Sequence, residues 1–256
     1  MAKRPEDYEL EFLHQCTKEE LAPLVGIVLG TDKDGNIDLN GRISSELESK
    51  PAFKKHYPDH TKYVDEIIEE VQKYGGNAIR NRLRGSGVTY HELLCDVCDK
   101  RKVNYNKVQR TEVIEEGLLC KVLSDTWSKL SDEEKATLLS EVGGGRANVG
   151  GVAYAALIAL FRRGGLASYR LVLIVVNTIA KAILGRGFTL LGNVMLVETL
   201  SVLAGPIGWA IAGAWMAIDC AGPAYRVTVP AAVYIAALRK MKKEGAALSA
   251  AERGEA

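Results

Sequence analysis

The segment that decides the fold of this chain is Thr199–Ile218, which reads TLSVLAGPIGWAIAGAWMAI. Its 20 residues carry no charge, and Glu198 and Asp219 lie directly on either side of it. The length suits a helix that crosses a bilayer core, but the Gly-Pro-Ile-Gly sequence at 205–208 interrupts the segment near its middle. The segment therefore predicts a kinked membrane span, two short helices in a tight hairpin, or a buried hairpin of a soluble protein.

Small residues recur every four positions in this segment, at Ala204, Gly208 and Ala212. Such a smooth ridge lets two helices approach closely. Together with Gly205 and Pro206, the ridge predicts a turn packed by small residues at the centre of a helical bundle. The pattern suits a soluble bundle and a membrane bundle equally.

Charge is unevenly divided along the chain, although the formal net charge of +1 and the 25% of charged residues are typical of soluble proteins. Residues 149–238 contain two acids and six bases. These are Glu198 and Asp219, and Arg162, Arg163, Arg170, Lys181, Arg186 and Arg226. A basic, apolar segment of this kind favours contact with an anionic surface.

The start of the chain and its cysteines indicate the compartment. No apolar run opens the sequence, so no signal peptide is expected. The five cysteines are an odd number without an obvious pairing, which favours a reducing environment. We expect a cytoplasmic protein, peripheral or integral at the inner membrane if the apolar helices enter lipid.

Helical periodicity dominates the first half of the chain. A helix is expected over residues 8–15, with Leu10 and Leu13 facing inward. A second helix should begin after Thr61 and end at the glycines at 75–76, and two more are expected over about 89–101 and 111–127. Thr17 with Glu20, and Ser131 with Glu134, match the capping box that opens a helix. No run alternates strongly enough to predict a strand.

Composition changes at the Gly-rich residues 143–151, which are expected to link two domains. They lack the lysine and hydroxyl residue that complete a phosphate-binding loop. Residues 1–142 are expected to form a charged helical domain that opens with a short helical module, residues 1–30. Residues 152–243 are expected to form a Gly/Ala-rich apolar helical bundle, and residues 244–256 a disordered tail. The fold class is therefore all-α.

His91, Cys95 and Cys98 are the candidate metal or redox residues. They share one face of an expected helix, and the two cysteines have CxxC spacing. A zinc site needs a fourth ligand and a thioredoxin-like site needs a preceding strand, and the sequence predicts neither. We expect both cysteines to be small core residues, with no metal and no cofactor.

Two cationic clusters are candidates for binding an anion or a lipid headgroup. They consist of Arg80, Arg82 and Arg84 beside a Gly-Ser-Gly turn, and Arg239, Lys240, Lys242 and Lys243 at the end of the last apolar helix. Arginines beside backbone amides suit a phosphate. Cations that end an apolar helix either cap its dipole or hold it at an anionic membrane surface.

Other motifs predict no chemistry. The run Asp32–Asp38 lacks the glycine and the glutamate of an EF-hand loop at their required positions, which favours a polar turn. The four histidines stand in no catalytic motif, and the isolated acids Glu198 and Asp219 form no carboxylate pair. We therefore expect a protein that is not an enzyme.

Three segments, 8–29, 74–106 and 222–239, carry a family resemblance. They contain the sequences EFLHQCT, YGGN and GPAYRVTVP. In this order the chain resembles the YaaW family of uncharacterised bacterial proteins. The resemblance implies a bacterial, largely helical protein with a short amino-terminal helical module. It also implies a distant grouping with the ubiquinol–cytochrome c chaperones, which assist assembly of a membrane complex.

Three functions are compatible with these features. In the first, the apolar, basic carboxy-terminal helices engage a membrane surface or a protein client, and the amino-terminal domain binds a partner. In the second, the chain is a soluble assembly factor or chaperone-like adaptor. In the third, it is a thiol or metal enzyme that uses the CxxC helix. No nucleic-acid partner is expected, and a homo-oligomer is compatible with all three.

Overall fold

The computed structural model describes residues 7–30, 46–75, 87–143, 152–184, 207–208, 210–211 and 225–254. Within these ranges every regular element is a helix, which confirms the all-α prediction. Gly208 is buried and is the one residue of the predicted small-residue turn that lies in the described ranges. Ala204, Gly205, Pro206 and Ala212 lie outside them, so the predicted turn stays a prediction.

The amino-terminal module forms as its sequence predicts. The 3₁₀ helix η1 (Tyr8–Gln15) buries Leu10 and Leu13, and α1 (Lys18–Leu29) follows it. Thr17 accepts a hydrogen bond from the backbone of Glu20, whose carboxylate accepts one from the Thr17 amide at 2.8 Å. This reciprocal pair is the predicted capping box, and it satisfies two backbone donors at the start of the helix.

Residues 46–75 form four further helices, and the last of them is the helix expected between Thr61 and the glycines at 75–76. They are η2 (Glu46–Ser49), α2 (Pro51–His56), η3 (His60–Lys62) and α3 (Val64–Tyr74). Residues 50–60 contain Pro51 and Pro58, and α2 nevertheless occupies part of this range. Proline suits the first turn of a helix and basic residues suit its last turn, where α2 carries Lys54, Lys55 and His56.

Residues 87–143 form α5 (Tyr90–Arg101), α6 (Thr111–Trp127) and α7 (Asp132–Glu141), in agreement with the expected ranges. The capping box predicted for Ser131 and Glu134 opens α7, and a second box, Thr89 with Glu92, opens α5. Gly87 lets the chain enter α5 closely beside α3. A side chain at this position would place its Cβ 2.8 Å from the backbone of Gln72.

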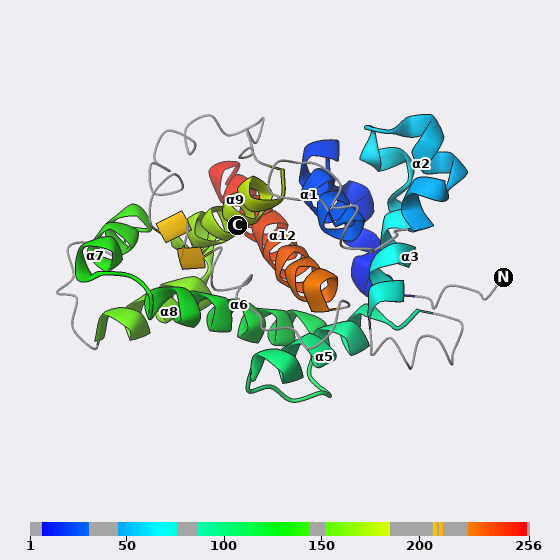
Figure 1. Cartoon of the computed structure of the whole chain (residues 1–256). Helices are drawn as coiled ribbons and strands as arrows, with labels where there is room; N and C mark the ends of the chain where they lie inside the picture. The colour runs from blue at the N-terminus through cyan, green and yellow to red at the C-terminus, as the bar shows by residue number, and fades with distance from the viewer. Residues whose placement is uncertain are drawn as a thin grey trace.

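The carboxy-terminal half contributes α8 (Val152–Arg163), α9 (Gly165–Leu184) and α12 (Tyr225–Glu252). Gly164 and Gly165, with φ of 81° and 73°, make the turn between α8 and α9 in a conformation that other residues rarely adopt. Helix α12 runs through the middle of the molecule and packs against α9, α6, α1 and α5 (Figure 1). It therefore contacts helices from both expected domains.

Helix α9 is the one helix in the described ranges that is long and apolar enough to cross a membrane. Of its apolar window, 67% is buried inside the protein, as in the core helix of a soluble fold. Residues 171–180 are all buried.

Helix α12 continues through residues 244–252, where the sequence predicts a disordered tail. Glu244 is 8% exposed, and its carboxylate accepts a hydrogen bond from the Gly165 amide at 2.8 Å. A carboxylate at a helix amino terminus satisfies a backbone donor and interacts favourably with the helix dipole. Residues 244–252 are therefore helical, and Glu244 at their start caps α9.

The two predicted capping boxes, at Thr17–Glu20 and Ser131–Glu134, should contribute differently to stability, because among the described residues only the first has a further ion-pair partner. We expect Glu134→Ala to lower the free energy of unfolding by about 1 kcal/mol, the usual value of an exposed cap. Glu20 also pairs with Lys242 of α12 at 2.8 Å. We expect Glu20→Ala to cost roughly 3 kcal/mol, because it also leaves that ammonium group unpaired in a half-buried site. Urea denaturation of both variants checks this, and equal costs would contradict it.

Candidate functional site on helix α12

A densely connected polar region lies where the apolar part of α12 ends. All described side chains from Val227 to Leu238 are buried. The next residues include Arg239, Lys240, Lys242 and Glu244, which point in different directions because successive helix positions differ by about 100°. Together they contact several neighbouring helices. We call these four residues the α12 polar collar.

Arg239 joins α12 to α6 and to the amino-terminal module. Its Nε lies 2.9 Å from the carboxylate of Glu115 on α6, and a terminal nitrogen donates to the backbone carbonyl of Glu9. The guanidinium group also lies over the ring of Phe12, 4.3 Å from its centroid. These contacts use both the charge and the planar shape of arginine, which lysine does not share.

Glu115 is the most deeply buried acid of this region, with 4% of its side chain exposed. The Tyr90 hydroxyl donates to it at 2.8 Å. Burial raises the pKa of Glu115 to about 7, although Arg239 and Tyr90 both lower it. Removal of the carboxylate from water is therefore the larger effect, and Arg239 compensates part of it.

Lys240 and Lys242 also pair with acids, Lys240 on α6 and within α12 and Lys242 on α1. Lys240 lies 3.4 Å from both Glu116 and Glu244 and stands over the ring of Phe161. Lys242 pairs with Glu20 and also donates to the backbone carbonyl of Gln15 at 3.0 Å. The collar thus connects α12 with η1, α1, α6 and α9.

The predicted anion-binding residues therefore have different surroundings. Arg239, Lys240 and Lys242 have carboxylate partners within the protein, whereas Lys243 is exposed. Arg80, Arg82 and Arg84 lie outside the described residues. Binding of an anion or a lipid headgroup by either cluster stays a prediction.

His91, Cys95 and Cys98 lie on α5 as predicted, and the structure gives each a local role. The two ring nitrogens of His91 lie 3.0 Å from the Thr111 hydroxyl and 2.9 Å from the Lys107 carbonyl. Cys95 and Cys98 are both buried. Among the described residues, no group of three or more histidine, cysteine and acidic side chains is arranged to hold a metal ion.

The thiols have the properties of core residues. Burial raises the pKa of Cys98 to about 12 and also raises that of Cys95. A thiolate is the form of cysteine that attacks substrates and binds metals. Burial therefore disfavours the thiolate form of both side chains.

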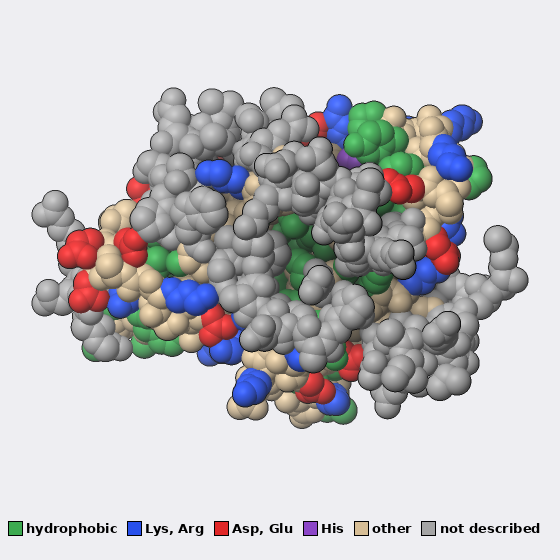
Figure 2. Space-filling model, viewed as in Figure 1, with side chains coloured by type: hydrophobic (Ala, Val, Ile, Leu, Met, Phe, Trp, Pro, Cys, Tyr) green, Lys and Arg blue, Asp and Glu red, His purple; other side chains and the backbone are tan. Residues whose placement is uncertain are grey.

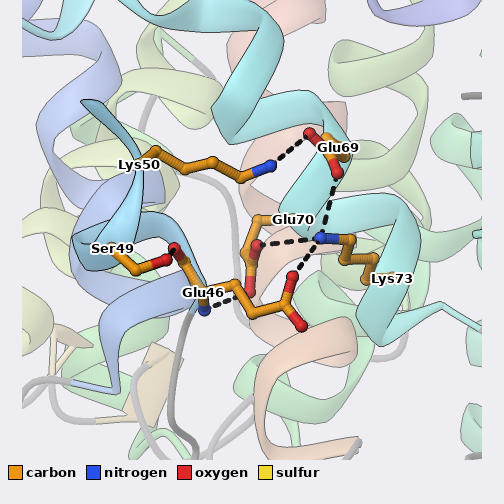
Figure 3. A network of polar contacts seen from close by, with 6 residues as sticks. All are labelled: Glu46, Ser49, Lys50, Glu69, Glu70 and Lys73. Atoms are coloured by element: carbon orange, nitrogen blue, oxygen red, sulfur yellow. Dashed lines mark hydrogen bonds and ion pairs between the residues drawn. The ribbon is translucent and has the colours of Figure 1, made fainter. Parts of the chain in front are cut away.

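A second polar cluster joins η2 to α3 (Figure 3). The Lys73 ammonium lies 2.6 Å from Glu46 and 2.9 Å from Glu69, and Lys50 also pairs with Glu69 at 2.9 Å. Burial raises the pKa of Glu70, whose carboxylate accepts a hydrogen bond from the Glu46 amide. Since the lysine ammonium groups pair with these acids, the cluster acts as a structural tie.

The sequence prediction missed the acids that form ion pairs with the cations of the α12 polar collar. Glu115 lies between the buried residues Ile114 and Leu118 of α6. A carboxylate at a position that faces the core is rare unless it is paired, so this placement is a signal that the sequence contains. Its partner on α12, Arg239, cannot be identified from the sequence, because the two residues are 124 positions apart.

The Arg239–Glu115 pair predicts strong coupling between two substitutions. We expect Arg239→Met to lower the free energy of unfolding by about 3–5 kcal/mol, because it leaves a buried carboxylate unpaired. The double variant R239M/E115L should lose less than the sum of the two single losses. Urea denaturation over the four combinations checks this, and simple additivity would contradict it.

The same pair has a defined pH dependence. Without Arg239 the pKa of Glu115 in the folded state rises further above about 7. The folded variant then holds a proton that the unfolded chain releases, so its stability falls as pH rises through this range. The loss caused by Arg239→Met should therefore grow above pH 7. The double variant R239M/E115L is the control and should lack this trend.

The buried thiols give a further prediction. In a Cys220→Ser background, the remaining cysteines Cys16, Cys95, Cys98 and Cys120 should react very slowly with a thiol reagent in the native state and fully in urea, because all four are buried. At Cys98, a pKa of about 12 against the ordinary 9.0 implies about a thousandfold less thiolate. A native thiol that reacts at the rate of free cysteine would instead support the thiol-enzyme hypothesis.

Comparison with known proteins identifies relatives along almost the whole chain. A UPF0174 protein of Helicobacter pylori strain J99 is 45% identical over 235 residues, which cover 91% of each chain. The UPF0174 protein YaaW of Escherichia coli strain K12 is 34% identical over 242 residues, or 92% of this chain and 94% of that protein. No solved structure matches significantly.

A family model described as ubiquinol-cytochrome C chaperone matches residues 97–250. The match begins within α5 and includes α6, α9 and the α12 polar collar. It covers more than half of the chain and confirms the predicted distant grouping. The chain therefore belongs to the UPF0174 family, which includes YaaW, and to the ubiquinol-cytochrome C chaperone family.

Proposed function

We propose that this protein is a non-enzymatic, chaperone-like assembly factor that binds a protein client through its carboxy-terminal helices. The observation that carries the proposal is the match of the chaperone family model to residues 97–250. The description of that family names a chaperone, and a chaperone acts by binding another protein. The factor is proposed to act from the cytoplasm.

The polar contacts of the described residues support a role in binding. The collar cations are paired with acids, and the His91 ring nitrogens contact Thr111 and Lys107. The CxxC thiols are buried and have raised pKa values. These groups stabilise the helical scaffold, and none of them is arranged as a nucleophile with a base.

The amino-terminal helices are proposed to have a separate task. The described residues before position 97 form η1, α1, η2, α2, η3, α3 and the start of α5, and they lie outside the matched region. We assign to their charged surface the contact with a second partner. The matched region is assigned the contact with the client.

Deletion of the gene in its host tests the function. We expect profiling of native complexes by mass spectrometry to show loss of at least one multi-subunit complex, because its assembly needs the factor. Expression of the wild-type chain should restore that complex. Cross-linking through tagged wild-type protein should capture an unassembled subunit of the same complex.

A matched variant separates this function from the thiol-enzyme hypothesis. The C95S/C98S chain should restore the complex as well as the wild type does, since the proposed role uses no thiol chemistry. Complex profiles that are identical with and without the gene would contradict the assembly role. Failure of C95S/C98S alone, with normal folding by circular dichroism, would support the enzyme.

A further inference from the structure

Helix α8 has an apolar outward face at the edge of the molecule. Its buried residues Ala153, Leu157 and Phe161 point toward α6 and α9. On the opposite side, an arc of about 100° contains positions 152, 155, 159, 162 and 163 at the usual 100° per residue. All five of these residues are exposed. We call them the α8 outer face.

This composition is unusual for a surface helix. An edge helix normally carries polar and charged residues on the side that faces water. The α8 outer face begins with Val152, which is 79% exposed, and continues with Ala155 and Ala159. Its first polar residue is Arg162. The first ten residues of α8 therefore offer apolar surface to their surroundings.

The charges on this face have one sign. Arg162 and Arg163 end the helix on either side of the apolar arc, and both are exposed. Described residues 152–184 include four cations and no acid. Arg162 lies 3.7 Å from Glu116, a loose contact that leaves 60% of its side chain exposed. The face therefore complements a negatively charged partner.

A further apolar side chain stands beside the arginines. Leu166 follows the glycine turn into α9 and is 44% exposed. Large exposed apolar side chains thus lie near both ends of α8, at Val152 and Leu166. Figure 2 shows hydrophobic side chains at the surface at lower left, where α8 lies in Figure 1.

We propose that the α8 outer face docks onto an anionic membrane surface. Alanines and a valine would rest at the boundary of the headgroups, and the arginines would reach the phosphates while their stems cover apolar surface. The two exposed arginines, in a stretch without acids, favour an anionic lipid surface as the partner. The proposal goes beyond client binding, because it specifies where the factor would act.

Flotation of the purified full-length chain with lipid vesicles tests the proposal. We expect the protein to float with vesicles of phosphatidylcholine mixed with phosphatidylglycerol, and much less with phosphatidylcholine alone. R162Q/R163Q should lower the partition coefficient about thirtyfold. Each basic residue near such a surface contributes about 1 kcal/mol, and about 1.4 kcal/mol corresponds to a factor of ten.

The chain offers a matched control for charge. K54Q/K55Q removes two adjacent exposed cations from the last turn of α2 and changes the net charge equally. It should float nearly as the wild type does. A155Q/A159Q tests the apolar part without altering charge, and it should also reduce flotation. Circular dichroism of each variant checks that it is folded.

Several outcomes would overturn the proposal. One is a wild-type chain that stays unbound with anionic vesicles, and another is equal loss in R162Q/R163Q and K54Q/K55Q. A dimer in light scattering that A155Q/A159Q dissociates, without vesicle binding, would assign the face to a second copy of the chain. Assembly of the client complex is measured in a separate experiment. A chain that does not bind membranes would therefore not contradict the proposed assembly function.

Discussion

The structure depends on the enclosure of helix α12. Its apolar part, residues 227–238, lies in the middle of the protein and is covered by helices from both halves of the chain. Burial of so many apolar side chains is the main favourable term in folding such a domain. The helix continues directly into charged residues that remain close to the core. These charges therefore need partners within the protein.

The α12 polar collar satisfies that constraint. Arg239, Lys240 and Lys242 each find a carboxylate on a neighbouring helix, and Glu244 receives the amide that opens α9. Buried ion pairs stabilise a fold only modestly, since the charges lose their water, but removal of one partner is costly. The collar therefore fixes which helices lie beside α12 more than it adds to stability.

The same contacts bear on function. Sequence motifs single out the CxxC thiols and the cations at the end of α12 as candidate functional groups. In the structure these thiols are buried in the core, and Arg239, Lys240 and Lys242 pair with carboxylates. The surface that departs from the usual pattern is the α8 outer face, which is apolar, basic and exposed. Polar groups that hold the helices together and an apolar edge helix are both compatible with the binding role proposed for this protein.

The sequence by itself determined the helical class, the bounds of α5, α6 and η1, and the capping boxes at Thr17 and Ser131, because periodicity and caps depend on residues within one turn of each other. Only the tertiary structure decided the partners of the charges on α12. Arg239 and Glu115 are 124 positions apart, and Glu244 and Gly165 are 79 apart. The same cation suits a lipid phosphate or a buried carboxylate, and the packing of the helices determines which of the two it meets.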